Sequence, residues 1–269
     1  LNTCPILDPA LNRVLSPLKH TLLPLVNEPV QIRLALGLDG VAALVESHRA
    51  LPPAFYSGVR ALVPSSLVGL SASINGLRTT IAGAGQVAVH GIDGTPLHMP
   101  VSSFGQANHG INNLLGHTVR NWVESGRFRN ALELFSGAGN LTVVLADSAR
   151  KVASVELDEE ACGAARNNLS ARKIKKATVI HGDVLEIYRD IGDRFQLAIM
   201  DPPRTGHREL ALGLAKGKQQ AVIYVSCNPA TLSRDVKELK KGGYELTKAL
   251  GFDMFPQTAH MEAAVLMER

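Results

Sequence analysis

Strand-like and helix-like segments alternate along the chain from about residue 110 onward. Short apolar runs bounded by Gly, Asn and Asp are separated by longer segments whose apolar residues recur with helical spacing. Because parallel strands need a crossover helix between them, this alternation predicts a doubly wound α/β sheet with parallel strands. The expected strands cover residues 130–135, 151–156, 177–181, 195–201 and 220–225, and the first expected helices cover 110–125, 141–148 and 158–172.

Residues 30–99 have a different pattern. Short β-like runs such as VQIRLALGL and LVGLSASI are broken by turn residues, as in Asn75-Gly76,. We therefore predict a smaller, mainly antiparallel α+β domain over residues 1–100, followed by the α/β domain over residues 101–269. The chain has 269 residues, 45% of them apolar, which is enough for two cores. It begins with Leu1 rather than Met, so we expect upstream residues in a longer product.

Charge and cysteine content restrict the class of protein. The net charge of +4 allows a polyanionic partner, although many soluble proteins share it,. Cys4, Cys162 and Cys227 are too widely spaced for a disulfide framework or a CxxC metal site,, which favours a reducing cytoplasm. No apolar stretch reaches the roughly 18 residues that span a bilayer, and no signal peptide is visible. We expect a cytoplasmic monomer with no membrane partner.

Glycine and acidic residues follow three successive expected strands, where ligands of doubly wound sheets bind. The stretch 135–140 (FSGAGN) allows a tight turn close to a ligand, although a GxG alone is equally a simple turn,. Glu156 can accept hydrogen bonds from both ribose hydroxyls of an adenosine ligand, while Asp158 suits a helix N-cap. Asp183 can accept from an adenine amino group, or can cap the next helix.

The combined order of these features resembles the class I S-adenosylmethionine-dependent methyltransferases. A dinucleotide site competes with this interpretation, but its GxGxxG motif needs a third glycine where Leu141-Thr142 stand,. The chain also lacks a GxxxxGK[ST] loop, which argues against nucleoside triphosphate chemistry.

The fourth expected strand ends in Asp201-Pro202-Pro203-Arg204. The two prolines direct the chain away from the sheet, so Asp201 is expected to face the crevice, unless it only forms a strand-end turn. Arg204 can contact a phosphate or a base, or can be an ordinary solvated surface group.

Cys227 stands just outside the apolar run that forms the fifth expected strand, before a helix expected to begin near Pro229. A thiol at a helix N-terminus has a depressed pKa and can act as a thiolate nucleophile. The alternative is a buried, inert cysteine, which is our interpretation of Cys162. Glu262 opens a final strand-like run and can be a general base or a surface carboxylate. His260 can orient that site or can be structural.

These stretches together resemble the RNA (uracil-5-)-methyltransferase family. The resemblance covers about residues 100–269 in the family's order, and the SCNPAT and DMFPxTxHxE pair is highly specific. It implies S-adenosyl-L-methionine as cofactor, Cys227 as nucleophile, Glu262 as base with Asp201 beside them, and Arg204 and His260 as substrate contacts. The matching stretches are residues 103–108, FSGAGN, VE, GD, DPPRTG, VSCNPATLSRD and DMFPQTAHME, and the implied cofactor site comprises Gln106, Phe135, Gly137, Asn140, Glu156, Asp183 and Asp201.

The chemistry implied by the resemblance needs a cysteine and a base. C5 of uracil is too poor a nucleophile to accept a methyl group unaided, and thiolate addition at C6 makes C5 enolate-like. A base then removes the C5 proton, and the thiolate leaves by β-elimination. The uracil must first leave its stack or loop, so we expect base flipping.

The sequence departs from relatives at three points. Cytosine-5 RNA methyltransferases keep a cysteine after the Pro-Pro of the fourth strand, where this chain has Arg204, which favours uracil. Several relatives carry a four-cysteine iron–sulfur cluster, but only Cys4 resembles one of those ligands here, so we expect no cluster in this chain. Nothing matches the small β-barrel RNA-binding domain of many relatives. RNA affinity is then expected from residues 1–100 and from the basic runs 172–176 and 237–241, unless those runs are solvated helix ends.

We expect an enzyme that methylates C5 of a uridine in structured RNA. The CPIL and DMFPQTAH stretches favour 23S rRNA, with the T-loop uridine of tRNA as the second target. A catalytically inactive RNA-binding homologue is a further alternative, against which the complete set of Gln106, Asp201, Cys227 and Glu262 stands. A methyltransferase acting on nitrogen would not need Cys227.

Overall fold

The computed structural model describes residues 3–63, 65–103, 105–106, 108–256 and 258–269. The described chain divides into two compact units, the first within residues 1–90 and 96–104 and the second within 91–95 and 105–269. Phe104, Ala107 and Gln257, which belong to the matching stretches, lie outside the described residues. No described helix is both long and apolar enough to cross a membrane.

The first unit is built on a four-stranded sheet in the order β1-β2-β3-β4. The outer pairings are antiparallel, as predicted, but β2 and β3 are parallel. They can be parallel because α2 lies between them in the chain and forms the crossover,. A separate antiparallel hairpin, β5–β6, follows. The elements are α1 (Pro9–Leu22), η1 (Leu23–Leu25), β1 (Gln31–Gly37), β2 (Gly40–Ser47), α2 (Pro53–Arg60), β3 (Gly69–Ile74), β4 (Leu77–Gly83), β5 (Gln86–His90) and β6 (Pro96–Pro100).

The helix α1 was not predicted, although its local signals are present in the sequence. Asp8 caps it by accepting a hydrogen bond from the Ala10 N–H, and a proline follows at the first helical position,. Val14, Leu18 and Leu22 are spaced four residues apart and are buried on one face,. With Phe55 of α2 they form the core of the first unit against its sheet.

The second unit contains the predicted doubly wound sheet, with seven strands in the order β12-β13-β11-β10-β7-β8-β9. The strands β11, β10, β7, β8 and β9 are parallel, whereas β13 and β12 run antiparallel at one edge. The elements are α3 (His109–Ser125), β7 (Asn130–Leu134), α4 (Asn140–Ser148), β8 (Lys151–Glu156), α5 (Glu159–Ala171), β9 (Ala177–His181), α6 (Val184–Ile191), η2 (Gly192–Arg194), β10 (Leu197–Met200), α7 (Arg208–Lys216), β11 (Ala221–Ser226), α8 (Pro229–Lys241), β12 (Glu245–Phe252) and β13 (Glu262–Glu268).

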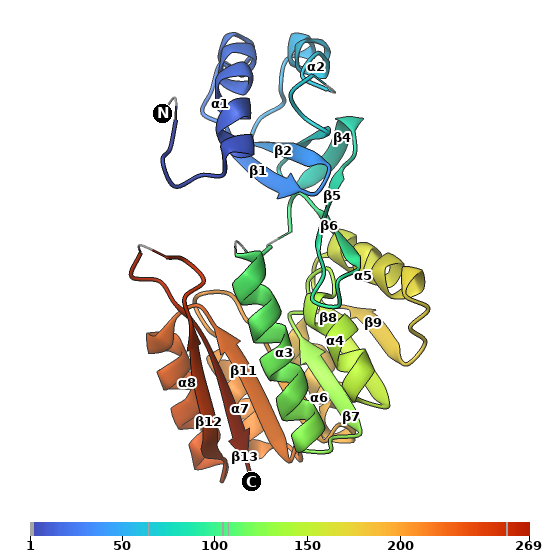
Figure 1. Cartoon of the computed structure of the whole chain (residues 1–269), viewed down its shortest axis with the longest axis vertical. Helices are drawn as coiled ribbons and strands as arrows, with labels where there is room; N and C mark the ends of the chain where they lie inside the picture. The colour runs from blue at the N-terminus through green and yellow to red at the C-terminus, as the bar shows by residue number, and fades with distance from the viewer. Residues whose placement is uncertain (1–2, 64, 104, 107, 257) are drawn as a thin grey trace. The chain divides into compact units, whose positions relative to one another are not determined.

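Helices cover both faces of this sheet. In one layer α4 contacts both α3 and α5, and in the other α7 contacts both α6 and α8 (Figure 1). The central strands β10 and β11 are buried at every position, as expected for a sheet covered on both faces. Ile199, Val222 and Tyr224 are fully buried there.

The antiparallel edge decides where the chain's last predicted site residue lies. The strand β13 pairs with β11 so that Ala263 lies opposite Ser226. Because β13 runs in the opposite direction, its first residue, Glu262, lies at the edge where β11 ends. The strand β12, which was not predicted, pairs with the outer side of β13.

Candidate active site

The predicted site residues of the second unit meet at the carboxyl edge of its sheet. Five parallel strands end at this edge, and a residue or turn that the sequence analysis selected lies at the last residue of each strand or within two residues after it,. In spatial order from β9 to β13 these are Asp183, Glu156, the turn 135–140, Asp201, Cys227 and, at the start of the antiparallel strand, Glu262.

The glycine turn after β7 is braced by the carboxylate of Glu156. Its Oε2 accepts a hydrogen bond from the Gly137 N–H at 2.9 Å, and its Oε1 accepts from the N–H groups of Leu157 and Asp158 at 2.8 and 2.9 Å. These bonds use three of the roughly four lone-pair sites of a carboxylate. One site on Oε2 is left for a ligand, which is less than the pair of ribose bonds that the sequence suggested.

The turn itself exposes backbone to an open space. Gly137 has a φ of 53°, and a Cβ added there would meet nothing within 4 Å. Phe135 is not a glycine but has a φ of 66°. Left-handed conformations of bulky residues are costly and concentrate at ligand sites. The local geometry therefore matches a backbone shaped for close approach by a ligand.

Two of the four buried side-chain polar atoms that have no hydrogen-bond partner among the described residues belong to, or adjoin in sequence, the predicted cofactor-site residues. They are the Oε1 atom of Gln106 and the Oγ atom of Ser136. Because an unpaired buried polar atom costs about 1–3 kcal/mol, such atoms indicate a missing polar ligand. Ser136 was not selected from the sequence, although its position directly after β7 was a usable signal.

Asn140 and Asp183 already have protein partners. The side-chain amides of Asn140 and Asn112 exchange hydrogen bonds of 2.9 and 3.2 Å between α4 and α3. Asp183 caps α6, since its Oδ1 accepts from the N–H groups of Leu185 and Glu186. Asp158 caps α5, as predicted. The sequence analysis did not select Asn112, because nothing local marks a buried amide on a helix face as a partner.

Cys227, Glu262 and Asp201 interact electrostatically at the carboxyl edge. Glu262 is only 2% exposed, and both carboxylates act electrostatically on the thiol. Burial raises the pKa of Glu262 to about 8, and the charge of Asp201 raises it in the same direction. Burial also raises the pKa of Asp201 to about 7.

The prediction of a depressed thiol pKa was wrong. Burial raises the pKa of Cys227 above its usual value, and the charges of Glu262 and Asp201 raise it further. A backbone hydrogen bond and Arg204 act in the opposite direction, but more weakly. The N-terminus of α8 therefore does not dominate, because burial and the charges of Glu262 and Asp201 all oppose ionisation of the thiol,.

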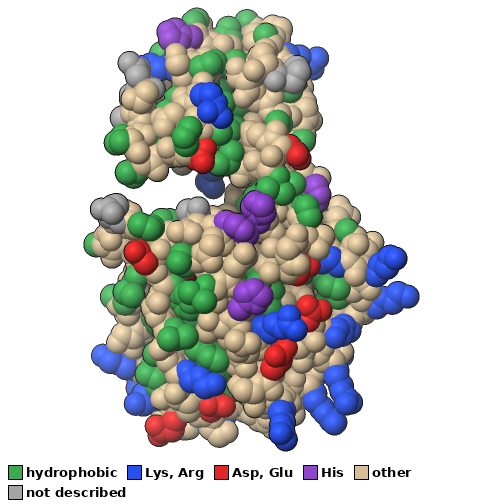
Figure 2. All heavy atoms as spheres, viewed as in Figure 1, with side chains coloured by type: hydrophobic (Ala, Val, Ile, Leu, Met, Phe, Trp, Pro, Cys, Tyr) green, Lys and Arg blue, Asp and Glu red, His purple; other side chains and the backbone are tan. Residues whose placement is uncertain are grey.

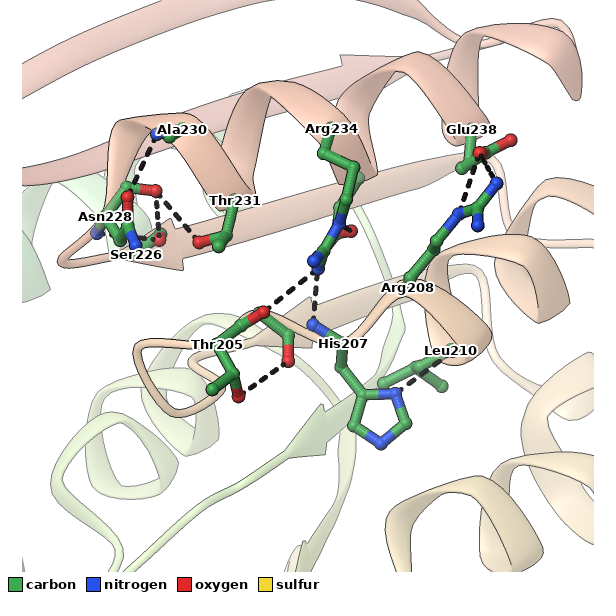
Figure 3. Close-up of polar contacts among 12 residues, drawn as sticks. Thr205, His207, Arg208, Leu210, Ser226, Asn228, Ala230, Thr231, Arg234 and Glu238 are labelled. Carbon is green, nitrogen blue, oxygen red and sulfur yellow. Dashed lines mark hydrogen bonds and ion pairs between the residues drawn. The ribbon is translucent and has the colours of Figure 1, made fainter.

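A loop between β10 and α7 is tied to α8 beside the cysteine. The Arg204 carbonyl accepts hydrogen bonds from the side chains of Asn228 and Thr231, both at 3.2 Å. Figure 3 shows Arg234 of α8 reaching the Thr205 carbonyl, a contact of 3.0 Å. The same close-up shows hydrogen bonds between Ser226 and Asn228, the two residues that flank Cys227 in the sequence.

Asp235, which is fully buried, lies at the centre of the hydrogen bonds between α8 and this loop. Its Oδ2 accepts hydrogen bonds from the His207 N–H at 2.9 Å and the Tyr224 hydroxyl at 2.7 Å, and its Oδ1 accepts from Arg234 at 2.8 Å. Gly206 passes so close that an added Cβ would lie 2.6 Å from that Oδ2. The sequence analysis quoted Asp235 within a motif but assigned it no role.

The two residues expected to contact substrate touch each other. Nη2 of Arg204 lies 3.2 Å from Nδ1 of His260, and both residues are exposed. Gln106, by contrast, lies in the segment before α3. Cys4 lies in the first unit, where its backbone bonds with the Asn12 side chain. Within the described ranges, no cluster of three or more His, Cys, Asp or Glu residues could hold a metal ion.

Comparison with solved structures identifies the fold class. A Pyrococcus abyssi tRNA (uracil-54, C5)-methyltransferase, crystallised with S-adenosyl-L-homocysteine, matches 99% of this chain and 69% of its own with a TM-score of 0.74 and 23% sequence identity. The second unit thus has the Rossmann-like fold of class I methyltransferases, as predicted.

The chain belongs to the tRNA (uracil-5-)-methyltransferase family, whose model matches residues 97–269. A 23S rRNA (uracil(1939)-C(5))-methyltransferase of Pseudomonas fluorescens is 41% identical over 170 residues, covering 61% of this chain and 36% of the relative. The enzyme of the same description from Vibrio parahaemolyticus is 30% identical over 272 residues, covering 99% of this chain and 62% of the relative. The chain therefore spans less than two thirds of either relative.

Proposed function

We propose that this chain transfers a methyl group from S-adenosyl-L-methionine to C5 of a uridine in RNA, with 23S rRNA as the favoured target. The observation that carries the proposal is the position of Cys227 and Glu262 at adjoining ends of β11 and β13. A nucleophile and a base for uracil C5 chemistry must act on the same ring. The activities for which the Pseudomonas and Vibrio relatives are named support the same reaction and target.

The residues present fit the proposed cofactor. S-adenosyl-L-methionine, when bound, supplies an electrophilic methyl group. Gln106 offers a buried oxygen without a partner, and Glu156 keeps one acceptor site beside the open space at Gly137. Phe135 begins the turn, and the Asp201 N–H donates to the carbonyl of Leu134 just before it. Asp183 offers its second carboxylate oxygen, and Asn140 acts through the helix that its pairing with Asn112 positions.

The chain's own groups then perform the proton and bond changes. The Cys227 thiolate adds to C6 of uracil and leaves C5 electron-rich. Once C5 carries the methyl group, Glu262 removes the C5 proton as a general base, and the electron pair of that C–H bond forms the C5–C6 double bond. The C6–sulfur bond breaks and returns the thiolate.

The charges at the site suit this division of roles. A carboxylate with a pKa of about 8 is a stronger base than an ordinary glutamate,. We assign Asp201 to the catalytic group because its charge helps to hold the Glu262 pKa high. Arg204 and His260 are exposed beside the same edge and are proposed to contact the substrate. Residues 1–100 are proposed to take part in RNA recognition, and cytoplasmic location and a monomeric state stay predictions.

The test uses 5-fluorouridine-containing RNA and S-adenosyl-L-methionine. Fluorine cannot leave C5 as a proton, so elimination stops and the protein–RNA adduct persists. We expect a slowly migrating band on a denaturing gel that Cys227→Ala abolishes. The matched control is Cys4→Ala, which removes a half-buried thiol from the first unit and should leave the adduct unchanged.

The target is decided by comparing two transcripts. One is a 23S rRNA segment around the uracil that the relatives' names specify, and the other is a tRNA T-arm. An adduct on the tRNA alone would move the target to tRNA. Methyl transfer to ordinary RNA without any adduct would contradict uracil-C5 chemistry. Cofactor binding without transfer or adduct on either RNA would instead support an inactive RNA-binding homologue.

A further inference from the structure

The edge of the second unit opposite the candidate site is strongly basic. Loops enter β10, β7, β8 and β9 at residues 192–196, 126–130, 149–151 and 172–176, and we call this surface the amino edge. Within these loops the sequence has a single acidic residue, Asp193, which lies 3.9 Å from Lys218. The exposed cations of the amino edge are Arg127, Arg129, Arg150, Lys151, Lys173, Lys175, Lys176 and Arg194.

These cations lie side by side because of the strand order. The strands β10, β7, β8 and β9 are consecutive neighbours in the sheet, and adjacent strands lie about 4.8 Å apart. The loops are also bonded to one another, since the Arg129 carbonyl accepts from the Arg150 and Lys151 N–H groups and the Lys176 carbonyl accepts from Val152 N–H. Figure 2 shows Lys and Arg side chains gathered along the lower and right rim of the view.

The cations of the amino edge are not neutralised within the protein. None of those listed forms an ion pair with another residue in the described part of the chain, and Lys151 lies over the Phe195 ring at 6.0 Å. Arg172 differs, because its guanidinium is buried and paired with Asp93 at 2.6 Å. The other basic run, 237–241, also differs, because Lys241 pairs with Glu238 at 2.6 Å.

We propose that the amino edge binds the phosphate backbone of RNA that extends beyond the target nucleotide. This inference rests on the proposed function. Like charges held together repel one another, and a polyanion that binds them gains the free energy of counterion release. The parallel strands are about 5 residues long, so about 17 Å of sheet separates this edge from the site. An RNA that contacts both must therefore be larger than the target loop.

The experiment compares two double variants that each remove two positive charges. Lys175→Gln with Lys176→Gln changes the amino edge. Lys237→Gln with Lys248→Gln changes exposed lysines on α8 and β12. It is the control, because the run 237–241 contains its own acidic partner in Glu238 and Lys248 lies outside both basic runs. Dissociation constants for a long 23S rRNA transcript and for a short stem-loop carrying the target uridine are measured over a range of salt concentrations. Methyl transfer to the short stem-loop is measured in parallel.

We expect the amino-edge variant to bind the long transcript about tenfold more weakly near 0.1 M salt, with a salt slope lower by about 1.4–1.8, because each lost phosphate contact removes about 0.7–0.9 from the slope. Binding and methylation of the short stem-loop should equal wild type for both variants. Unchanged binding of the long transcript, or an equal loss in the control, would overturn the proposal. Failure of wild type to methylate the stem-loop would instead overturn the proposed function, and the long-transcript comparison still decides the amino edge.

Discussion

The ionisation of single residues at the candidate site depends on their burial and on their charged neighbours. Cys227, Glu262 and Asp201 each have a raised pKa, with burial as the largest cause. All three therefore resist ionisation in the absence of substrate. Because the proposed reaction needs both a thiolate and a carboxylate, the protonation state of this group should control its rate.

Replacing Glu262 by Gln should make the Cys227 thiol more reactive toward a simple alkylating agent. The substitution removes a negative charge that raises the thiol pKa, so more thiolate is present at a given pH. We expect alkylation at pH 8 to be several-fold faster than in wild type, measured by mass spectrometry of the modified peptide. Alkylation of Cys4, a half-buried thiol of the first unit, provides the internal reference. A slower reaction at Cys227 would show that Glu262 acts on the thiol mainly as a base.

The pH dependence of methylation follows from the same shifts. A carboxyl whose folded-state pKa is about 8 is mostly protonated below that pH and becomes a base above it. The thiol pKa is also raised, so ionisation of both groups increases with pH. We expect kcat/KM to rise continuously between pH 6.5 and 9, without a falling limb in that range. A flat profile, measured with cofactor binding monitored separately, would contradict the assigned roles of both groups.

At the scale of elements, the geometry of the carboxyl edge depends on the hydrogen bonds between α8 and the loop that follows β10. Asp235 accepts three hydrogen bonds, one of them from the loop backbone at His207. The loop also places Arg204 between Asn228 and His260. Asp235, which is not proposed to contact the substrate, thus helps to position Arg204, which is.

Gly206→Ala should destabilise the protein through its contact with Asp235. Both Gly206 and Gly243 have left-handed φ values, of 66° and 86°, but only at Gly206 would a Cβ meet a carboxylate oxygen, at 2.6 Å. We expect each alanine to cost about 1 kcal/mol for its conformation, and Gly206→Ala to cost about 1–3 kcal/mol more because the Asp235 bonds must shift. Urea unfolding of the two variants measures the difference. Equal losses would mean that the loop can move away from α8 at little cost.

At the scale of the whole molecule, the chain combines two compact units with a small net charge. The charge of +4 conceals an uneven distribution within the second unit, whose acidic reaction centre and basic amino edge lie at opposite ends of the same strands. Global stability should respond to the cofactor site, because a ligand that binds only the folded state stabilises it.

S-adenosyl-L-homocysteine should raise the melting temperature of the protein. At a concentration of 100 times Kd the stabilisation is about 2.7 kcal/mol. Gln106→Ala should weaken binding about threefold to tenfold, because it removes one hydrogen-bonding group, and should reduce the shift accordingly. Gln220→Ala, which truncates an exposed side chain at the far end of β11, is the matched control. An equal shift in all three proteins would remove Gln106 from the cofactor site.

The sequence alone was sufficient to predict the doubly wound sheet, its strand-end motifs and the family. Those features depend on local periodicity and turn chemistry, which a short window of residues contains. It also placed caps such as Asp158 correctly. It did not reveal α1 and β12, or the parallel pairing of β2 with β3.

Only the tertiary structure decided which of these residues act on one another. Glu262 lies beside Cys227 because a distant strand pairs antiparallel with β11. Burial of the thiol, together with the charges of Glu262 and Asp201, reversed the expected direction of its pKa. The bonds between Asn140 and Asn112 and between Asp235 and the β10–α7 loop likewise join separate elements. Long-range pairing and burial determine the electrostatic environment of a group, and neither is encoded in its neighbours along the chain.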